Sequence, residues 1–262
     1  MAYLLVCTTA LLVAGLTFFS GFGLGTLLMP AFAVFFPLQI AIAATAVVHL
    51  ANNLFKLILV GRDAHWPTVL VYGIPASLGA IAGAFALSLS IGIPPLLTYH
   101  LGAGEHQITV VKLVVAMVIA GFAALELWPR FDELSFSRRY VALGGVISGF
   151  FGGLSGHQGA LRSAFLLRAG LTKDQFVATR VCGAVIVDVS RLAVYGATLV
   201  LADLQQLRAG GGFGLVAAAA VSAFVGSFVG SRLVRKVTMT GLRRFVGGAL
   251  ILLAAALAAG LI

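Results

Sequence analysis

The chain has 262 residues, of which 61% are hydrophobic and 10% are charged, and its formal net charge is +9. Soluble domains carry about a quarter charged residues, so this composition excludes an ordinary soluble protein and predicts an integral membrane protein in a lipid bilayer. The basic residues lie in short loops and form no continuous patch, which argues against nucleic acid as a partner and fits the positive-inside rule. Strand-like alternation is absent, so helices are expected to span the membrane.

Eight hydrophobic blocks are predicted, four on each side of a polar stretch. In the first half they are Ala2–Phe36, Leu38–Val60, Pro67–Leu89 and Ile108–Trp128. In the second half they are Tyr140–Leu167, Gln175–Leu201, Phe213–Leu233 and Leu242–Leu261. Residues 1–128 and 140–262 are therefore expected to form two transmembrane repeats, with residues 129–139 as a cytoplasmic linker.

Glycines interrupt the first block of each half, at Gly21–Gly25 and at Gly152–Gly159. Each interrupted block either crosses the membrane once as a broken helix, or turns at the glycines and leaves on the side it entered, as a V. The V arrangement collects most basic loop residues on one side: Arg62, Arg130, Arg138, Arg139, Arg168, Lys173, Arg232, Arg235, Lys236, Arg243 and Arg244. It leaves Lys112 and Arg208 on the other side, so the positive-inside rule favours the V.

Under the V arrangement each half holds one re-entrant helix pair and three full crossings, which makes the two halves inverted. The predicted fold class is therefore an all-α integral membrane protein with two inverted repeats. The basic loops are expected to face the cytoplasm and both termini to face away from it. Inverted repeats around a central site are typical of carriers that work by alternating access.

Two helices carry polar side chains at matching offsets, each along one face. The first stripe comprises Thr45, His49, Asn52, Asn53 and Lys56. The second comprises Arg180, Asp188 and Arg191. Residues at these spacings share a helix face, and Asp188 is close enough in sequence to pair with Arg191. Both stripes are expected to face the inside of the bundle, where they either bind a ligand or only join helices.

Four basic residues are predicted at membrane depth, namely Lys56, Arg162, Arg180 and Arg191. Asp188 is the acid expected there, whereas Glu126 is placed at an interface beside Trp128. A charge at the bilayer centre costs about 2.5–3.5 kcal/mol, so these cations are expected to serve a function, and a bound anion would relieve their repulsion. The structural alternative is that Lys56 and Arg180 snorkel to an interface.

The two glycine breaks offer a second kind of anion site. Half-helices that start after Gly25 and Gly159 would present unpaired backbone N–H groups, which bind anions, although glycines also serve close helix packing. His49 and His157 lie on the first stripe and in the second break. Either could titrate near neutral pH and couple transport to protons, or could be a core histidine.

The motifs resemble those of the TauE/SafE sulfite exporter family across essentially the whole chain. They are Gly21-x-Gly23-x-Gly25 ending at Pro30, Ala44-Thr45-Ala46-Val47 with Asn52-Asn53, and Ser148-Gly149-x-x-Gly152-Gly153 with Gly156-x-x-Gly159. The resemblance implies a multi-pass carrier of the cell (inner) membrane that exports sulfite, thiosulfate or an organosulfonate such as sulfoacetate. His157, Gln158 and Arg162 depart from the usual glycine-rich second break and add polar donors there.

The predicted function is export of a small sulfur-containing anion, bound near the midplane between the two breaks. The expected binding residues are Lys56, Arg162, Arg180, Arg191, Asn52, Asn53, His49, His157, Gln158, Gly25 and Gly159, with Asp188 holding Arg191. A passive anion channel is the nearest alternative. An intramembrane enzyme is disfavoured because the chain has no nucleophile–base or His-Glu-x-x-His motif. No cofactor or metal is expected, and the oligomeric state is left open.

Overall fold

The structure, a computed structural model, describes residues 1–16, 24–90, 92–102, 104–128, 135–198, 212–233 and 239–262. In the first half the elements are α1 (Ala2–Leu16), α2 (Leu24–Ala33), α3 (Leu38–Val60), η1 (Gly61–Asp63), α4 (Trp66–Ser88), β1 (Leu97–Leu101), β2 (Gly104–Ile108) and α5 (Val110–Leu127). In the second half they are η3 (Arg138–Tyr140), α6 (Val141–Ser155), α7 (Gly159–Leu166), α8 (Lys173–Thr198), α10 (Gly212–Leu233) and α11 (Met239–Ala258).

The helices confirm the all-α membrane class. Four described segments are long and apolar enough to cross a bilayer by length and composition: Leu38–Asp63, Trp66–Ser88, Val110–Leu127 and Gly212–Arg232. Their outward faces carry large exposed apolar side chains such as Ile58, Ile74 and Met117, which suit contact with lipid. Helix α8 has 26 residues, enough to cross as well, but it carries the second polar stripe.

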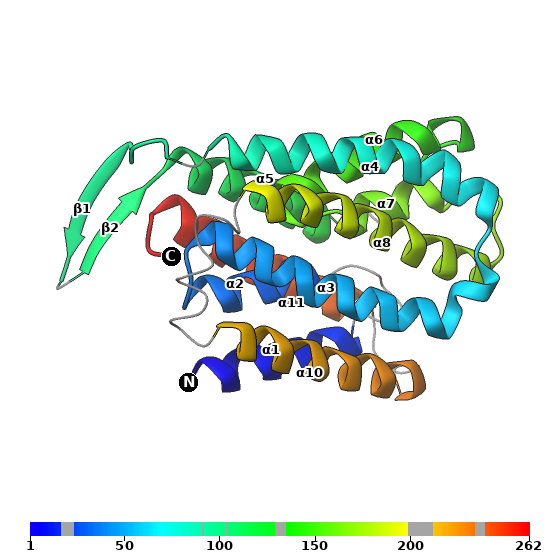
Figure 1. The fold of residues 1–262 in the computed structure, drawn as a ribbon, viewed down its shortest axis with the longest axis horizontal. Coiled ribbons are helices and arrows are strands. Elements are labelled where there is room, and N and C mark those ends of the chain that lie inside the picture. Colours follow the sequence, from blue (N-terminus) through cyan, green and yellow to red (C-terminus); the bar gives the residue numbers. More distant parts are fainter. Residues whose placement is uncertain (17–23, 91, 103, 129–134, 199–211, 234–238) are drawn as a thin grey trace.

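Two helix pairs, α1–α2 and α6–α7, are too short to cross as single helices. Helices α6 and α7 have 15 and 8 residues, and at about 1.5 Å per residue neither alone spans a hydrocarbon core of about 30 Å. In Figure 1, α1 and α3 start at one end of the bundle, and α6 and α8 start at the other. The chain therefore enters and leaves each short pair at the same end, which is the geometry of a V.

The second break is narrower than the sequence predicted. Gly152 and Gly153 are helical, within α6, so the expectation of a break across Gly152–Gly159 was wrong in its extent. The helix ends at Gly156, whose φ of 84° lies in the left-handed region that glycine adopts without strain. In the first break, Gly21 and Gly23 lie outside the described residues, and α2 already begins at Leu24, which places Gly25 in its first turn.

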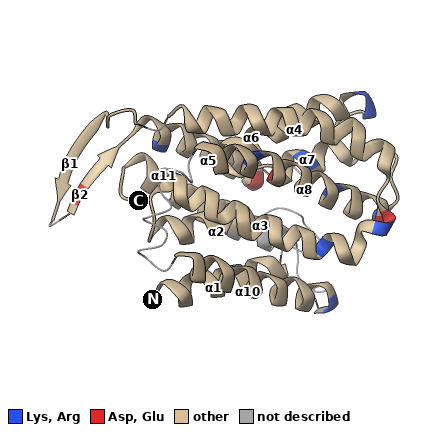
Figure 2. Ribbon diagram, viewed as in Figure 1, with Lys and Arg blue, Asp and Glu red and all other residues tan. Residues whose placement is uncertain are grey.

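The two ends of the bundle differ in charge and in structure. Both termini lie at the end that carries the β1–β2 hairpin (Figure 1). The described lysines and arginines gather toward the opposite end (Figure 2). The helices α3, α4 and α5 alternate in direction, and α8, α10 and α11 alternate in the opposite sense (Figure 1).

Close backbone contacts at glycines join α4 to α6 and α1 to α10. A Cβ placed on Gly149 of α6 would lie 2.1 Å from the Ala76 carbonyl oxygen of α4, and one on Gly83 would lie 2.0 Å from the Phe150 carbonyl oxygen. Helices α1 and α10 meet in the same way, since a Cβ on Gly226 would lie 2.1 Å from the Leu11 carbonyl oxygen. Small residues at four-residue spacing let helix backbones touch, which is how membrane helices pack without a hydrophobic driving force.

The hairpin between α4 and α5 was not predicted, because most of it lies between two of the predicted hydrophobic blocks. The strands are antiparallel, with Leu97 opposite Ile108. The Tyr99 hydroxyl donates to the Ala259 carbonyl, and Lys112 Nζ donates to the Gln107 carbonyl at 3.0 Å. The first contact ties the hairpin to the residue after α11, and the second ties it to the start of α5.

We expect Gly149→Ala to lower the free energy of unfolding by about 1–3 kcal/mol, because the added methyl group would overlap the backbone of α4. The matched control is Gly121→Ala on α5, where a Cβ would meet nothing within 4 Å. The midpoint of thermal unfolding in detergent measures both. Equal midpoints for the two variants would contradict the backbone contact between α4 and α6.

Candidate functional site

Asp188 is the centre of a buried polar network at the meeting of α3, α8 and the second break. Its Oδ2 accepts hydrogen bonds from His49 Nδ1 at 2.7 Å and from Asn53 Nδ2 at 2.9 Å. Its Oδ1 accepts from Gln158 Nε2 at 3.3 Å. The carboxylate is fully buried, and buried charges require such partners.

Arg191 completes the shell around this carboxylate, as its spacing from Asp188 predicted. Its Nε and Nη2 donate to Asp188 Oδ1 at 3.1 and 2.8 Å, and its Nη1 donates to the Gly152 carbonyl at 3.2 Å. The arginine is completely buried. It therefore neutralises Asp188 and anchors α8 to the last turn of α6.

The other three predicted cations are buried in the same part of the protein. Arg162 is 2% exposed, Arg180 is 3% exposed and Lys56 is 6% exposed, so neither Arg180 nor Lys56 snorkels to the surface. Arg162 Nη1 donates to Gln158 Oε1 at 2.8 Å, and Arg180 Nη1 donates to Ser163 Oγ at 3.3 Å. Lys56 lies close enough to both arginines for their like charges to repel one another. The three side chains therefore form one cluster.

Gly25, the described end of the first glycine break, meets the second break beside this cluster. A Cβ placed on Gly25 would lie 3.5 Å from the Gly156 carbonyl oxygen and 3.6 Å from His49 Cδ2. Helix α7 begins at Gly159, so its first-turn N–H groups have no acceptor within the helix. The structure thus brings Gly25, the second break and both stripes together. The sequence showed only that these features occur at matching places in the two halves.

Asn52 and Thr45 lie on the same face of α3 but do not contact Asp188. Asn52 Oδ1 accepts a hydrogen bond from Ser227 Oγ of α10 at 2.7 Å. Asn52 Nδ2 and Thr45 Oγ1 are buried without a hydrogen-bond partner in the part of the chain that the structure describes. Both groups are donors that a ligand entering along α3 would satisfy.

Glu126, predicted beside Trp128 at an interface, has its side chain buried within the protein, with 6% exposed. It lines a small pocket of about 10 Å³ together with His157, Gln158 and the start of α7. A single acidic residue near the end of an apolar helix gives no signal of which way it points, so this burial was not predictable.

Several supporting side chains were also missed. Tyr195 donates to the Gly153 carbonyl and Tyr72 contacts Ser148, so hydroxyl groups tie α8 and α4 to α6. Ser163 and Ser227 hold Arg180 and Asn52. Isolated serines and tyrosines in apolar helices form no pattern along the sequence, and only the fold shows their partners.

Comparison with known proteins decides the family. The family model for the sulfite exporter TauE/SafE matches residues 6–257. The chain belongs to the TauE/SafE family. No curated protein and no solved structure shows significant similarity to it. Membership in this family supports a multi-pass membrane transporter. At the level of the family, it also supports export of a sulfur-containing anion.

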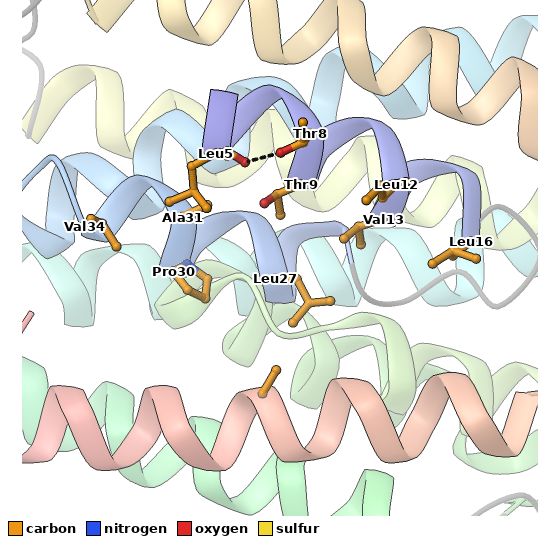
Figure 3. A pocket seen from close by; sticks show the side chains of 11 residues that line it. Leu5, Thr8, Thr9, Leu12, Val13, Leu16, Leu27, Pro30, Ala31 and Val34 are labelled. Carbon is orange, nitrogen blue, oxygen red and sulfur yellow. Dashed lines mark hydrogen bonds between the residues drawn. The ribbon is translucent and has the colours of Figure 1, made fainter. Parts of the chain in front are cut away.

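A cavity larger than the pocket beside His157 lies away from the polar network of this TauE/SafE protein. It is an apolar groove of about 480 Å³ lined by α1, α2 and Ala249 of α11 (Figure 3). Leu5, Leu12 and Val34 on its walls are exposed, and Thr8 turns its hydroxyl back to the Leu5 carbonyl at 3.1 Å. The groove offers no charge to an anion, so volume alone does not locate the site.

We expect Asp188→Asn to destabilise the protein by about 3–5 kcal/mol, because it leaves the buried Arg191 without its counter-charge. The control, Asp63→Asn, makes the same change at an exposed position in η1. Thermal unfolding in detergent compares the two variants. A midpoint for Asp188→Asn within error of the control would show that the network does not depend on this charge.

Proposed function

We propose that this chain carries sulfite, thiosulfate or a small organosulfonate across the membrane, and that the anion binds in the cluster around Arg162, Arg180 and Lys56. The single observation that carries the proposal is the convergence of these buried cations with both glycine breaks. Buried charge and broken helices at the centre of a membrane protein are typical of a transport site.

The chemistry of the cluster matches a sulfur oxyanion. Cations that repel one another are stabilised by an anion placed among them. Arginine presents its N–H groups in a planar fork that donates two hydrogen bonds to an oxyanion. Arg162 on α7 and Arg180 on α8 approach the site from two helices, and the first-turn N–H groups of α7 add partial positive charge. We assign Arg191 a supporting role, since Asp188 and Gly152 occupy its guanidinium.

Corresponding elements of the two halves meet at this site, which supports inverted repeats. Asn53 and Asp188 hold the same offset in the two stripes, and they contact each other at 2.9 Å. The packing of α6 on α4 has its counterpart in the packing of α1 on α10, and both use glycines. Contacts between equivalent residues are expected near a two-fold axis. We therefore propose that the two halves rock about this centre.

Burial of the cluster favours a carrier over an open pore. The cationic side chains are at most 6% exposed, and the pocket beside His157 has room for about one water molecule. An anion can reach these groups only if the helices around them move. Alternating opening toward the two sides supplies that movement.

The first test is calorimetric binding of sulfite, thiosulfate, sulfoacetate, sulfate and chloride to the purified protein. We expect one sulfur anion to bind saturably and Arg162→Gln to weaken it by about tenfold or more, because a charge-assisted hydrogen bond is lost. Arg168→Gln is the matched control, since Arg168 is exposed just beyond α7. Equal affinity in both variants, or chloride binding as tightly as every sulfur anion, would reject the assigned site.

Alternating access predicts reciprocal labelling of two cysteines on α3. In a background without Cys7 and Cys182, we expect Thr45→Cys and Lys56→Cys to react with a membrane-impermeant thiol reagent from opposite sides. Adding the bound anion should raise one reactivity and lower the other, because the two openings exclude each other. Simultaneous labelling from both sides, unchanged by the anion, would indicate a channel.

A further inference from the structure

The small pocket that Glu126 and His157 line lies next to the proposed anion site, between helices of both halves. It has a volume of about 10 Å³, which is the space of one water molecule. Its lining residues come from α2, α5, α7, α11 and the second break: Thr26, Phe122, Glu126, His157, Gln158, Gly159, Ala160 and Leu250. The pocket is too small for a sulfur anion but suited to a water molecule and a proton.

His157 presents a bare ring nitrogen in this pocket. Its Nδ1 lies 3.1 Å from the Ser155 carbonyl oxygen, which only accepts, so Nδ1 carries the hydrogen of the neutral ring. Nε2 then has a lone pair and finds no hydrogen-bond partner in the described part of the chain, although the side chain is 2% exposed. The Phe122 ring, centred 5.6 Å away, covers the imidazole.

Glu126 is the second titratable group on the same pocket. Its carboxyl group is buried on α5, one turn after Phe122. One water molecule in the pocket would lie between a carboxyl group and an imidazole Nε2, which is the arrangement that lets a proton pass between them. With one proton bound the pair is neutral, and without it the pair carries the negative charge of the carboxylate.

Gln158 connects the pocket to the proposed anion site. Gln158 follows His157 and lines the pocket, while its side chain contacts both Asp188 and Arg162. Thr26 follows Gly25, so the first break contributes to the pocket as well. A change of charge on the Glu126–His157 pair therefore acts within contact range of the groups proposed to hold the anion.

The charged surroundings of the pair are asymmetric. Helices α2 and α6 carry no titratable side chain. Charged or titratable groups on the other elements include Lys112 on α5, Arg162 on α7, His49 and Lys56 on α3, Arg180, Asp188 and Arg191 on α8, and Arg244 on α11. Most of these are cations, so they add to the attraction for an anion when the carboxylate is neutralised.

We propose that Glu126 and His157 form a proton-binding site that couples proton movement to anion transport. The inference rests on the proposed function and adds its coupling ion. A bound proton removes the negative charge beside Gln158, so proton and anion favour each other's binding and move together. Because this coupling is positive, the affinity for the anion increases as the pH falls through the range in which the pair takes up its proton.

The test uses the purified protein in liposomes that enclose a pH-sensitive dye, with radiolabelled thiosulfate or sulfite as the anion. We expect an imposed pH gradient to drive the anion toward the alkaline side and the anion to carry protons with it. Glu126→Gln and His157→Gln should each reduce this proton movement by about tenfold, while calorimetry at low pH still detects the anion. The matched controls are Glu105→Gln and His100→Gln on the exposed hairpin, which should behave as wild type.

The outcomes separate the two proposals. Anion transport by the wild type without proton movement, or proton movement that survives both pocket variants, would overturn the proton site and leave the transporter intact. Absence of any anion transport or binding by the wild type would overturn the proposed function, and the coupling with it. The wild-type measurement decides the coupling even if a pocket variant fails to fold.

Discussion

The buried carboxylate of Asp188 imposes the arrangement of everything around it. A charge without solvent must be surrounded by donors, and five N–H groups from His49, Asn53, Gln158 and Arg191 reach its two oxygens. These donors come from α3, α8 and the second break. The one carboxylate therefore joins the two helices that carry the polar stripes to the segment between α6 and α7. Gln158 also links this network to Arg162.

Such a centre is possible only because the surrounding helices pack backbone to backbone. Irregular chain at membrane depth must be enclosed by protein. The glycine contacts of α6 on α4, and of α1 on α10, bring each short pair against a long helix and leave no room for lipid between them. The hydrogen bonds from Tyr195 to the Gly153 carbonyl and from Arg191 to the Gly152 carbonyl then hold the last turn of α6 against α8.

Hydrophobic blocks and helical spacing were enough to predict most of the fold and the two stripes. The bounds of α3 match the predicted block Leu38–Val60, and the Asp188–Arg191 pair is present. Periodicity gives the face of a residue but not its partner across the bundle, so Ser227 and the burial of Glu126 were missed. Gly152 and Gly153 were read as a break because glycine signals both chain turning and close packing, and only the position of α4 and α8 distinguishes the two.

The two halves resemble each other in how their helices pack, but not in the charged side chains that they carry. This difference bears on the proposed mechanism. Helices α3 and α8 meet at equivalent positions, yet α3 contributes mainly amides and a histidine, whereas α8 and α7 contribute Asp188 and three arginines. Near-equivalent packing would give two openings of comparable energy, as the proposed alternating access requires. The charges that would hold an anion stay largely with the second half. An anion bound there would remain on one set of helices while the first half moves past it, with Lys56 and the donors of α3 closing over it from either direction.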